Sequence, residues 1–184
     1  MDYLVQYNQE TYIFETVRNR FTEQGFLNAY DFFCIVIWKA NRAKTKIAKR
    51  LLKQGNFSNL EDAVKSLITD ISEAVHPKEK LRLIMKDWGF QLPMATAILT
   101  VLYPDDFTVY DFRVCDELKD FYSLKNLLNF ESIWINYQAY KQMVEAAAPD
   151  GLSLRDKDRF LWGRSFSRQL ENDIKLGFNK NQGM

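Results

Sequence analysis

Apolar residues recur at helical spacing along nearly all of the 184-residue chain, and no stretch alternates with period two. The apolar positions of residues 3–22 fit a helix that Gly25 ends. Residues 30–38 are apolar on all sides, as in a central core helix, whereas residues 41–53 are amphipathic. These patterns predict an all-α protein of roughly eight to ten short helices, in one or two lobes.

Capping and breaking residues mark the ends of further helices. The pattern Ser58–Glu61 is typical of a capping box and predicts a helix that runs towards Ala74. The other predicted helices cover residues 77–88, 93–102, 111–118, 131–148 and 153–176, with one more short helix after Ser123. We expect a single all-helical domain over residues 1–184, with its central part at about residues 30–118, its C-terminal helices at about 123–176 and a frayed tail at 179–184.

Composition excludes several classes of protein. Hydrophobic residues make up 47%, which is too much for a disordered chain, and Gly and Pro together number only 11, which favours helices. The longest apolar run, Phe32–Trp38, is too short to span a bilayer, and Met1–Tyr3 does not begin a signal peptide. Cys34 and Cys115 are typical of reduced core residues. We therefore expect a cytoplasmic protein without a membrane partner or a four-cysteine metal site.

Charge is balanced overall but unevenly distributed. The chain has 25 basic and 24 acidic residues, a net charge of +1. Between Phe32 and Leu60 there is no acid, so 18 basic and 24 acidic residues remain elsewhere. A basic helix face is by default solvated, but structural helices usually mix charge signs, so contact with DNA phosphates is an equal alternative. The basic residues of this segment are Lys39, Arg42, Lys44, Lys46, Lys49, Arg50 and Lys53.

The most informative stretch is Lys86–Leu99, KDWGFQLPMATAIL, which VYDFR follows at Val109–Arg113. A helix, a turn with glycine, a second helix and an aspartate at the start of a third resemble the helix-hairpin-helix DNA glycosylase superfamily. That family has a leucine-proline-glycine-hydrophobe-glycine hairpin, a helix with a packing alanine, and a V-D-x-x-V segment with the catalytic aspartate. Gly89 matches the first hairpin glycine, Ala95 the packing alanine and Asp111 the catalytic aspartate.

An upstream segment extends the resemblance, which covers roughly residues 30–118. Asp31–Lys44 is similar to the family's earlier helix, whose end inserts polar side chains into the gap left by an extruded base. Asn41 is the best match to that wedge, although a shift of one residue would place Ala40 there. The resemblance implies a compact multi-helix fold of the family's type, with a cleft.

Two positions depart from the family pattern. Gln91 replaces the second hairpin glycine, in a turn that presents backbone N–H groups to a DNA phosphate, often with a metal ion. Pro93 stands where bifunctional members carry a Schiff-base lysine, and no lysine lies between Gly89 and Asp106. The resemblance therefore implies an enzyme without lyase activity, and we expect no metal, iron–sulfur cluster or other cofactor.

The activity that the resemblance implies is base excision from DNA. A monomer would bind duplex DNA, flip a damaged base and hydrolyse its N-glycosidic bond through an oxocarbenium-like state that the Asp111 carboxylate stabilises. The residues expected to bind DNA are Lys39, Asn41, Arg42, Lys46, Lys49, Arg50, Gly89, Gln91 and Arg113.

Simpler interpretations stand beside this one. Asp111 is also a favoured helix N-cap residue, Asp105 and Asp106 fit a solvated turn, and His76 fits a structural position at a helix start. Two other functions stay open. One is a non-enzymatic DNA-binding protein of the same fold, and the other is a helical protein-interaction module whose basic face meets an acidic partner.

Overall fold

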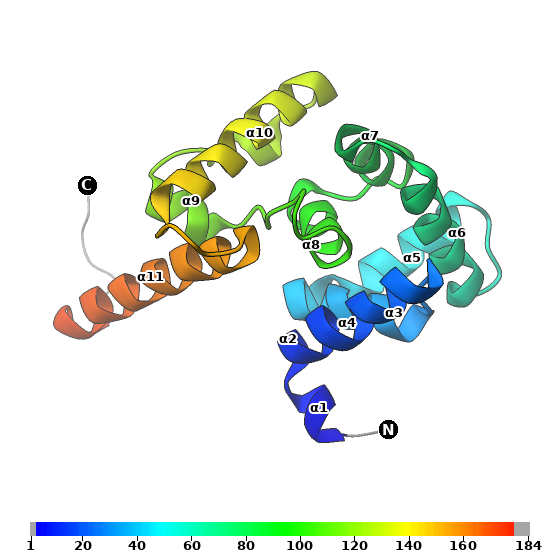
Figure 1. The fold of residues 1–184 in the computed structure, drawn as a ribbon, viewed down its shortest axis with the longest axis horizontal. Coiled ribbons are helices and arrows are strands. Elements are labelled where there is room, and N and C mark those ends of the chain that lie inside the picture. The colour runs from blue at the N-terminus through cyan, green and yellow to red at the C-terminus, as the bar shows by residue number, and fades with distance from the viewer. Residues whose placement is uncertain (1–2, 179–184) are drawn as a thin grey trace. The chain divides into compact units, whose positions relative to one another are not determined.

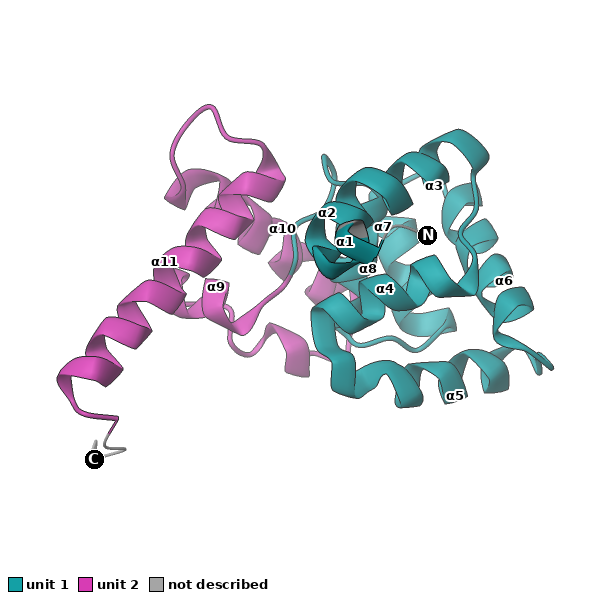
Figure 2. Cartoon of the chain, turned by 90° about the horizontal axis from the view of Figure 1, so that it is seen from below, with its two compact units in different colours: residues 1–109 teal, residues 110–184 magenta. Residues whose placement is uncertain are grey.

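The computed structural model describes residues 3–178, so the predicted frayed tail, 179–184, lies outside the described residues (Figure 1). Within residues 3–178 the protein contains helices and connecting segments but no strand, so the predicted all-α fold is confirmed. No helix in this range combines the length and the apolar content needed to cross a membrane. The chain divides into two compact units, Met1–Val109 and Tyr110–Met184, and the boundary falls inside the predicted central part (Figure 2).

Unit 1 consists of eight α-helices and three shorter helical segments in its described part. Its α-helices are α1 (Tyr3–Tyr7), α2 (Gln9–Thr11), α3 (Arg18–Gln24), α4 (Ala29–Ala40), α5 (Lys44–Gln54), α6 (Leu60–Glu73), α7 (Pro77–Arg82) and α8 (Leu92–Leu102). Two π-helical segments, Tyr12–Val17 and Leu83–Asp87, and a 3-10 turn, Asn41–Ala43, continue helices α2, α7 and α4 respectively. Such π segments widen a helix locally and are frequent near functional sites.

Helix α8 is the core of unit 1. Every residue from Met94 to Leu102 is buried, and the helix packs against α3, α4 and α7. Its two threonines are buried at little cost because each hydroxyl donates to a carbonyl one turn earlier, Thr96 to Leu92 at 2.9 Å and Thr100 to Thr96 at 2.7 Å. The sequence pattern placed the central helix at residues 30–38 instead, but α4 leaves one side half exposed.

The first helical region is less regular than its apolar spacing predicts. Asn8 interrupts the expected helix over residues 3–22, because its side chain accepts from the Thr11 backbone N–H and starts α2. Gly25 ends α3 in the left-handed conformation, as predicted. A buried carboxylate ties this region to α4: Asp31 accepts from the Tyr12 hydroxyl at 2.7 Å and pairs with Arg20.

The helix starts inferred from capping residues are largely confirmed. Pro77 and Pro93 lie in the first turns of α7 and α8, where a missing N–H costs nothing. The predicted start of α6 was one residue early, because Asn59, rather than Ser58, accepts from the Asp62 N–H at 2.9 Å. Glu61, the expected partner in that capping box, instead accepts from the Ala29 N–H at the start of α4.

Unit 2 contains α9 (Phe112–Leu118), α10 (Phe130–Ala147) and α11 (Leu154–Lys175) in its described part. Asp111 and Ser153 cap α9 and α11, as predicted, whereas the helix expected after Ser123 is only one 3-10 turn. Helix α9 packs on α10 and α11. Two ion pairs join α9 to α11: the buried Glu117 carboxylate of α9 lies 2.5 Å from nitrogens of both Arg164 and Arg168 of α11.

Buried phenols give the fold a predictable response to alkali. Burial raises the pKa of Tyr12 to about 12, and it raises the pKa values of Tyr110 and Tyr140 above the ordinary value of about 10. Above pH 10 the unfolded chain loses these protons while the folded chain keeps them, so stability falls as pH rises. We expect the free energy of unfolding, measured in urea, to fall by about 1.4 kcal/mol per pH unit for each tyrosine between pH 10 and 12.

The Tyr12→Phe variant is the control for this response, because it removes one ionisation from unit 1 and keeps the buried ring. Its free energy of unfolding should fall less steeply above pH 10 than that of the unmodified chain. Lys80, whose pKa burial lowers, acts in the opposite direction, but it is a single group, whereas burial raises the pKa of Tyr103 and Cys115 as well as those of the three tyrosines. An unfolding midpoint that stays constant from pH 8 to pH 11.5 would contradict the prediction.

Candidate functional site

The basic face predicted over residues 41–53 forms on α5. Ile47 and Leu51 are buried against α4 and α6. The basic side chains of the segment lie on the other side of the helix, where they are exposed or, for Arg50, half exposed. Within the part of the chain that the structure describes, six of these cations form no ion pair with a carboxylate. They are Arg42, Lys44, Lys46, Lys49, Arg50 and Lys53. Their mutual repulsion therefore has no acidic compensation along the helix, which favours binding of an external anion.

The predicted hairpin turn follows the second π-helical segment. Gly89 has φ of +70°, a left-handed conformation that glycine adopts without strain, and the Phe90 N–H donates across the turn to Ile84 O at 2.9 Å. Trp88 is buried and stacks on Phe57 with ring centroids 6.2 Å apart. Its indole N–H donates to Asp70 of α6 at 2.9 Å. Trp88 is therefore a core residue that fixes the turn.

The start of α8 leaves backbone donors available. Among the described residues, the N–H groups of Gly89, Gln91 and Leu92 donate to no protein acceptor. Gln91 has φ of −77°, a conformation open to every residue, so the glycine of the family pattern is not required here. Its side chain is exposed and its carbonyl accepts from the N–H of the buried Ala95 at 2.9 Å. The departure at Gln91 thus leaves the turn's donors in place.

Helix α5 and the hairpin turn lie side by side in unit 1. The Gln54 side-chain amide donates to the Asp87 carbonyl at the end of the π segment. A Cβ atom built on Gly89 would lie 3.4 Å from Nη1 of Arg50, which places this guanidinium directly over the turn. Lys46 and Lys53 share the helix face of Arg50 by their spacing. Residues that are almost forty positions apart therefore form one surface, here called the α5–hairpin surface.

The end of α4 carries the predicted wedge. Ala40 has φ of −162° and ψ of 87°, so the helix breaks there and resumes as the 3-10 turn that Asn41 begins. The Asn41 side chain is exposed and accepts from Nζ of Lys44 at 2.8 Å. Lys39 lies in the last turn of α4 and is half buried. These side chains lie at the end of helix α4.

Asp111 belongs to unit 2. Its Oδ1 accepts from the Arg113 backbone N–H at 3.0 Å, so the carboxylate caps α9, and the residue is half exposed. Tyr140, a buried residue of α10, forms a hydrogen bond with the Asp111 backbone. The capping role is thus confirmed, and the carboxylate is held in a fixed orientation. Asp111 thus lies in unit 2, whereas the α5–hairpin surface lies in unit 1.

Arg113 is held by α11. Its guanidinium carbon lies 5.2 Å from the ring centroid of Trp162 and 5.3 Å from that of Phe166, and Nη1 donates to Gln169 Oε1 at 2.7 Å. Of the Trp162 side chain, 42% is exposed. The spacing of Trp162 and Phe166, four residues apart on a helix, was the available signal for an exposed aromatic pair.

The described residues contain no group of three His, Cys, Asp or Glu side chains that could hold a metal ion. Cys34 lies in unit 1 and Cys115 in unit 2, and both are free thiols. Comparisons with protein-family models, curated proteins and solved structures found no match to this chain. The fold and the surface thus define an all-α protein with an uncompensated basic helix beside a glycine turn, and its activity must be inferred from that chemistry.

Proposed function

We propose that this chain is a DNA-binding protein of the helix-hairpin-helix glycosylase type. It hydrolyses the N-glycosidic bond of a damaged base in duplex DNA, with Asp111 as the essential carboxylate and without lyase activity. Support comes from the order of elements: a helix that ends at Asp87 before the turn at Gly89, a buried second helix from Leu92, and a third helix that Asp111 caps.

The α5–hairpin surface is the observation that carries the proposal. A phosphate is bound by cations and backbone N–H groups that have no competing partner. This surface offers both, because the Arg50 guanidinium lies over Gly89 and the N–H groups of the half-exposed Gly89 and the exposed Gln91 donate to no described protein atom. Phosphate contacts fix the position of DNA and make its affinity depend strongly on salt.

The hydrolytic step is assigned to Asp111. Cleavage of a glycosidic bond builds positive charge on the sugar, and a carboxylate beside it lowers that barrier and orients the attacking water. Asp111 is half exposed, and its backbone and Oδ1 are fixed by α10 and α9, so its carboxylate needs little reorganisation to act. Chemistry of this kind requires no cofactor.

The lysines of unit 1 support hydrolysis rather than Schiff-base chemistry. No lysine lies between Gly89 and Asp106. The buried Lys80 is committed elsewhere, because Nζ donates to the carbonyls of Ile71 and Ala74 at the end of α6. The same Nζ lies 4.3 Å from the ring centroid of Tyr103. It therefore caps a helix, and its amine is not presented to a substrate.

The test combines binding with cleavage. The protein is incubated with duplexes that carry oxidised, alkylated or deaminated bases, and alkali-labile sites are counted. If about four phosphates are contacted, affinity should fall about 100-fold between 50 and 200 mM salt. We expect alkali-labile sites on at least one lesion, and no enzyme–DNA adduct after borohydride.

Each alternative function has its own outcome in this test. Salt-dependent binding without cleavage of any lesion would overturn the enzymatic proposal in favour of a DNA-binding protein of the same fold. Absence of binding at low salt would overturn both and leave a protein-interaction module. Strand breaks without alkali, trapped by borohydride, would overturn the absence of lyase activity.

A further inference from the structure

Beside α9 lies an exposed pair of aromatic side chains that takes no part in the proposed hydrolysis. Phe112 follows the cap residue Asp111 and is 65% exposed, and Tyr122, from the segment after α9, is 40% exposed. Their ring centroids are 5.7 Å apart. The Tyr122 hydroxyl donates to Asp116 at 3.2 Å, which fixes the ring against α9. Neighbouring exposed apolar side chains that form a patch, unlike scattered ones, can mark a binding surface.

A second exposed aromatic pair lies on α11. Trp162 and Phe166 are 42% and 41% exposed, and their rings stack at 5.6 Å with an interplanar angle of 9°. The Arg113 guanidinium, from the same first turn of α9 as Phe112, lies over both rings. Each pair therefore involves a residue of the first turn of α9. Phe112, Tyr122, Trp162 and Phe166 are called the aromatic platform below.

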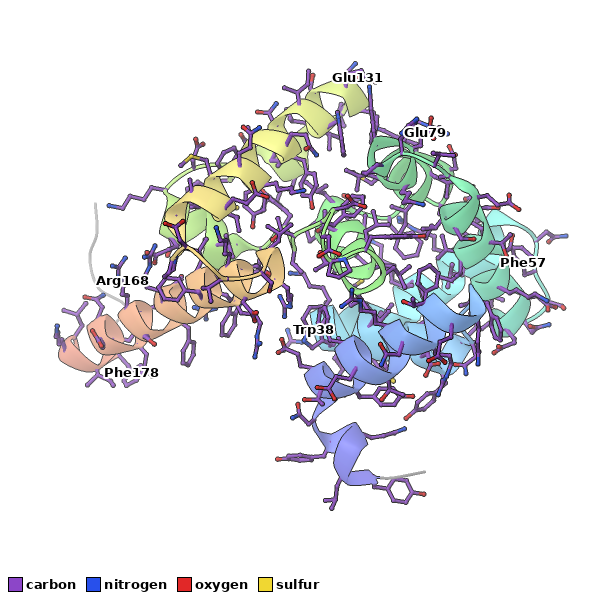
Figure 3. The ribbon with its side chains drawn as sticks, viewed as in Figure 1. Trp38, Phe57, Glu79, Glu131, Arg168 and Phe178 are labelled. Atoms are coloured by element: carbon purple, nitrogen blue, oxygen red, sulfur yellow. The ribbon has the colours of Figure 1, made fainter. Side chains whose placement is uncertain are left out.

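Both arginines and carboxylates lie near the platform, and one of the arginines, Arg113, has no carboxylate partner among the described residues. The Arg113 side chain bonds to the neutral Gln169 amide and, within the described residues, to no carboxylate. Arg164 and Arg168, the latter labelled on α11 in Figure 3, share the single carboxylate of Glu117. Exposed rings beside a guanidinium group that has no carboxylate partner suit a ligand that has both π faces and negative charge.

We propose that the aromatic platform binds unpaired nucleobases of DNA by stacking, while Arg113 and the arginines of α11 attract the adjoining phosphates. The choice of DNA as the ligand rests on the proposed function. The binding itself involves neither hydrolysis by Asp111 nor the phosphate contacts of unit 1. Single-stranded segments and extruded nucleotides expose the required π faces, whereas a paired duplex does not.

The test compares two 12-residue single strands of DNA with the same phosphates, one of thymidines and one of abasic sites, by fluorescence anisotropy with the full chain. We expect the base-bearing strand to bind about 10-fold more tightly, since stacking on an aromatic side chain stabilises each base appreciably. Trp162→Leu and Phe112→Leu should each remove most of that preference and change the affinity for the abasic strand by less than about 2-fold.

Phe160→Leu is the matched control. Phe160 is also on α11, is 39% exposed and lies under an arginine, with the Arg164 guanidinium 5.3 Å from its ring centroid. It is two positions before Trp162 in the chain, so it faces another side of the helix. Its replacement should leave the preference for bases unchanged. Because Phe112 is mostly exposed, Phe112→Leu keeps the core intact, and an unchanged circular dichroism spectrum and urea midpoint confirm that the variant folds.

Three outcomes would overturn the inference. In the first, the unmodified chain binds both strands equally, or the platform variants weaken both equally. In the second, Phe160→Leu reduces the preference as much as Trp162→Leu does. In the third, the chain sediments as a dimer that Trp162→Leu dissociates, which would identify the platform as a protein interface. If the chain cleaves damaged duplex but shows no preference for the base-bearing strand, the proposed function stands and this inference fails. If it prefers the base-bearing strand but cleaves no duplex, the inference stands and only the proposed hydrolysis fails.

Discussion

Replacement of Asp111 by asparagine should lower the rate of base excision by about 100-fold or more, because it removes the charge that stabilises the developing oxocarbenium ion. Binding to the damaged duplex should stay equal or become stronger, since a carboxylate close to DNA repels phosphates. The measurement is single-turnover cleavage of the best lesion duplex, with anisotropy on the same duplex.

The substitution separates catalysis from capping. Asparagine is as good an N-cap as aspartate, so the Asp111→Asn variant should keep α9 and its unfolding midpoint. Asp106→Asn, at an exposed aspartate of the turn after α8, is the matched control and should cleave at the normal rate. Full cleavage by Asp111→Asn, or equal losses in the two variants, would show that Asp111 is only a cap.

Local chemistry explains why most helix ends were predictable. Gly25, Pro77, Pro93 and Ser153 act within one turn of the chain, through a left-handed φ, a missing N–H or a capping oxygen. The predicted start of α6, at Ser58, is one residue early, because the neighbouring Asn59 is an equally good N-cap residue and caps the helix instead. Glu61, which would complete a capping box with Ser58, accepts from the Ala29 N–H of α4. That contact joins residues 32 positions apart, so the local sequence pattern cannot predict it.

Some features depend on how the helices pack against one another and could not be predicted from the hydrophobic pattern of the sequence. Both α4 and α8 are strongly apolar, and only the contacts of α8 with α3, α4 and α7 make it the core helix of unit 1. The exposure of Trp162 also depends on packing, because α11 buries Leu161 and Ser165 but leaves 42% of Trp162 exposed beside Arg113 of α9. Arg50 and Gly89 were each candidates by sequence, and their proximity depends on how α5 packs.

The second large effect is expected from reversing charge on α5. The double variant Lys46→Glu and Lys53→Glu changes two exposed side chains on the helix face of Arg50. Each lost phosphate contact should reduce the slope of log affinity against log salt by about 1, so we expect a slope smaller by about 2. Affinity for duplex DNA at 50 mM salt should fall about 100-fold, measured by anisotropy over a salt series.

The matched control carries the same change in net charge elsewhere. Lys65→Glu with Lys125→Glu replaces two exposed lysines outside α5 and should weaken binding only slightly, through the long-range field. Equal losses in the two double variants would show that net charge, rather than the α5–hairpin surface, attracts DNA.

Stability should move in the opposite direction to affinity in the α5 variant. A glutamate at position 46 would lie one turn from Arg42 and Arg50, and a glutamate at position 53 would lie one turn from Lys49, so repulsive pairs become attractive ones. Each such pair stabilises a helix by about 0.2–0.5 kcal/mol, so the thermal midpoint should rise slightly while DNA binding is lost. A surface whose cations served the fold would lose stability on reversal. A gain in stability with a loss of binding is therefore the result that identifies these cations as ligands for an external anion.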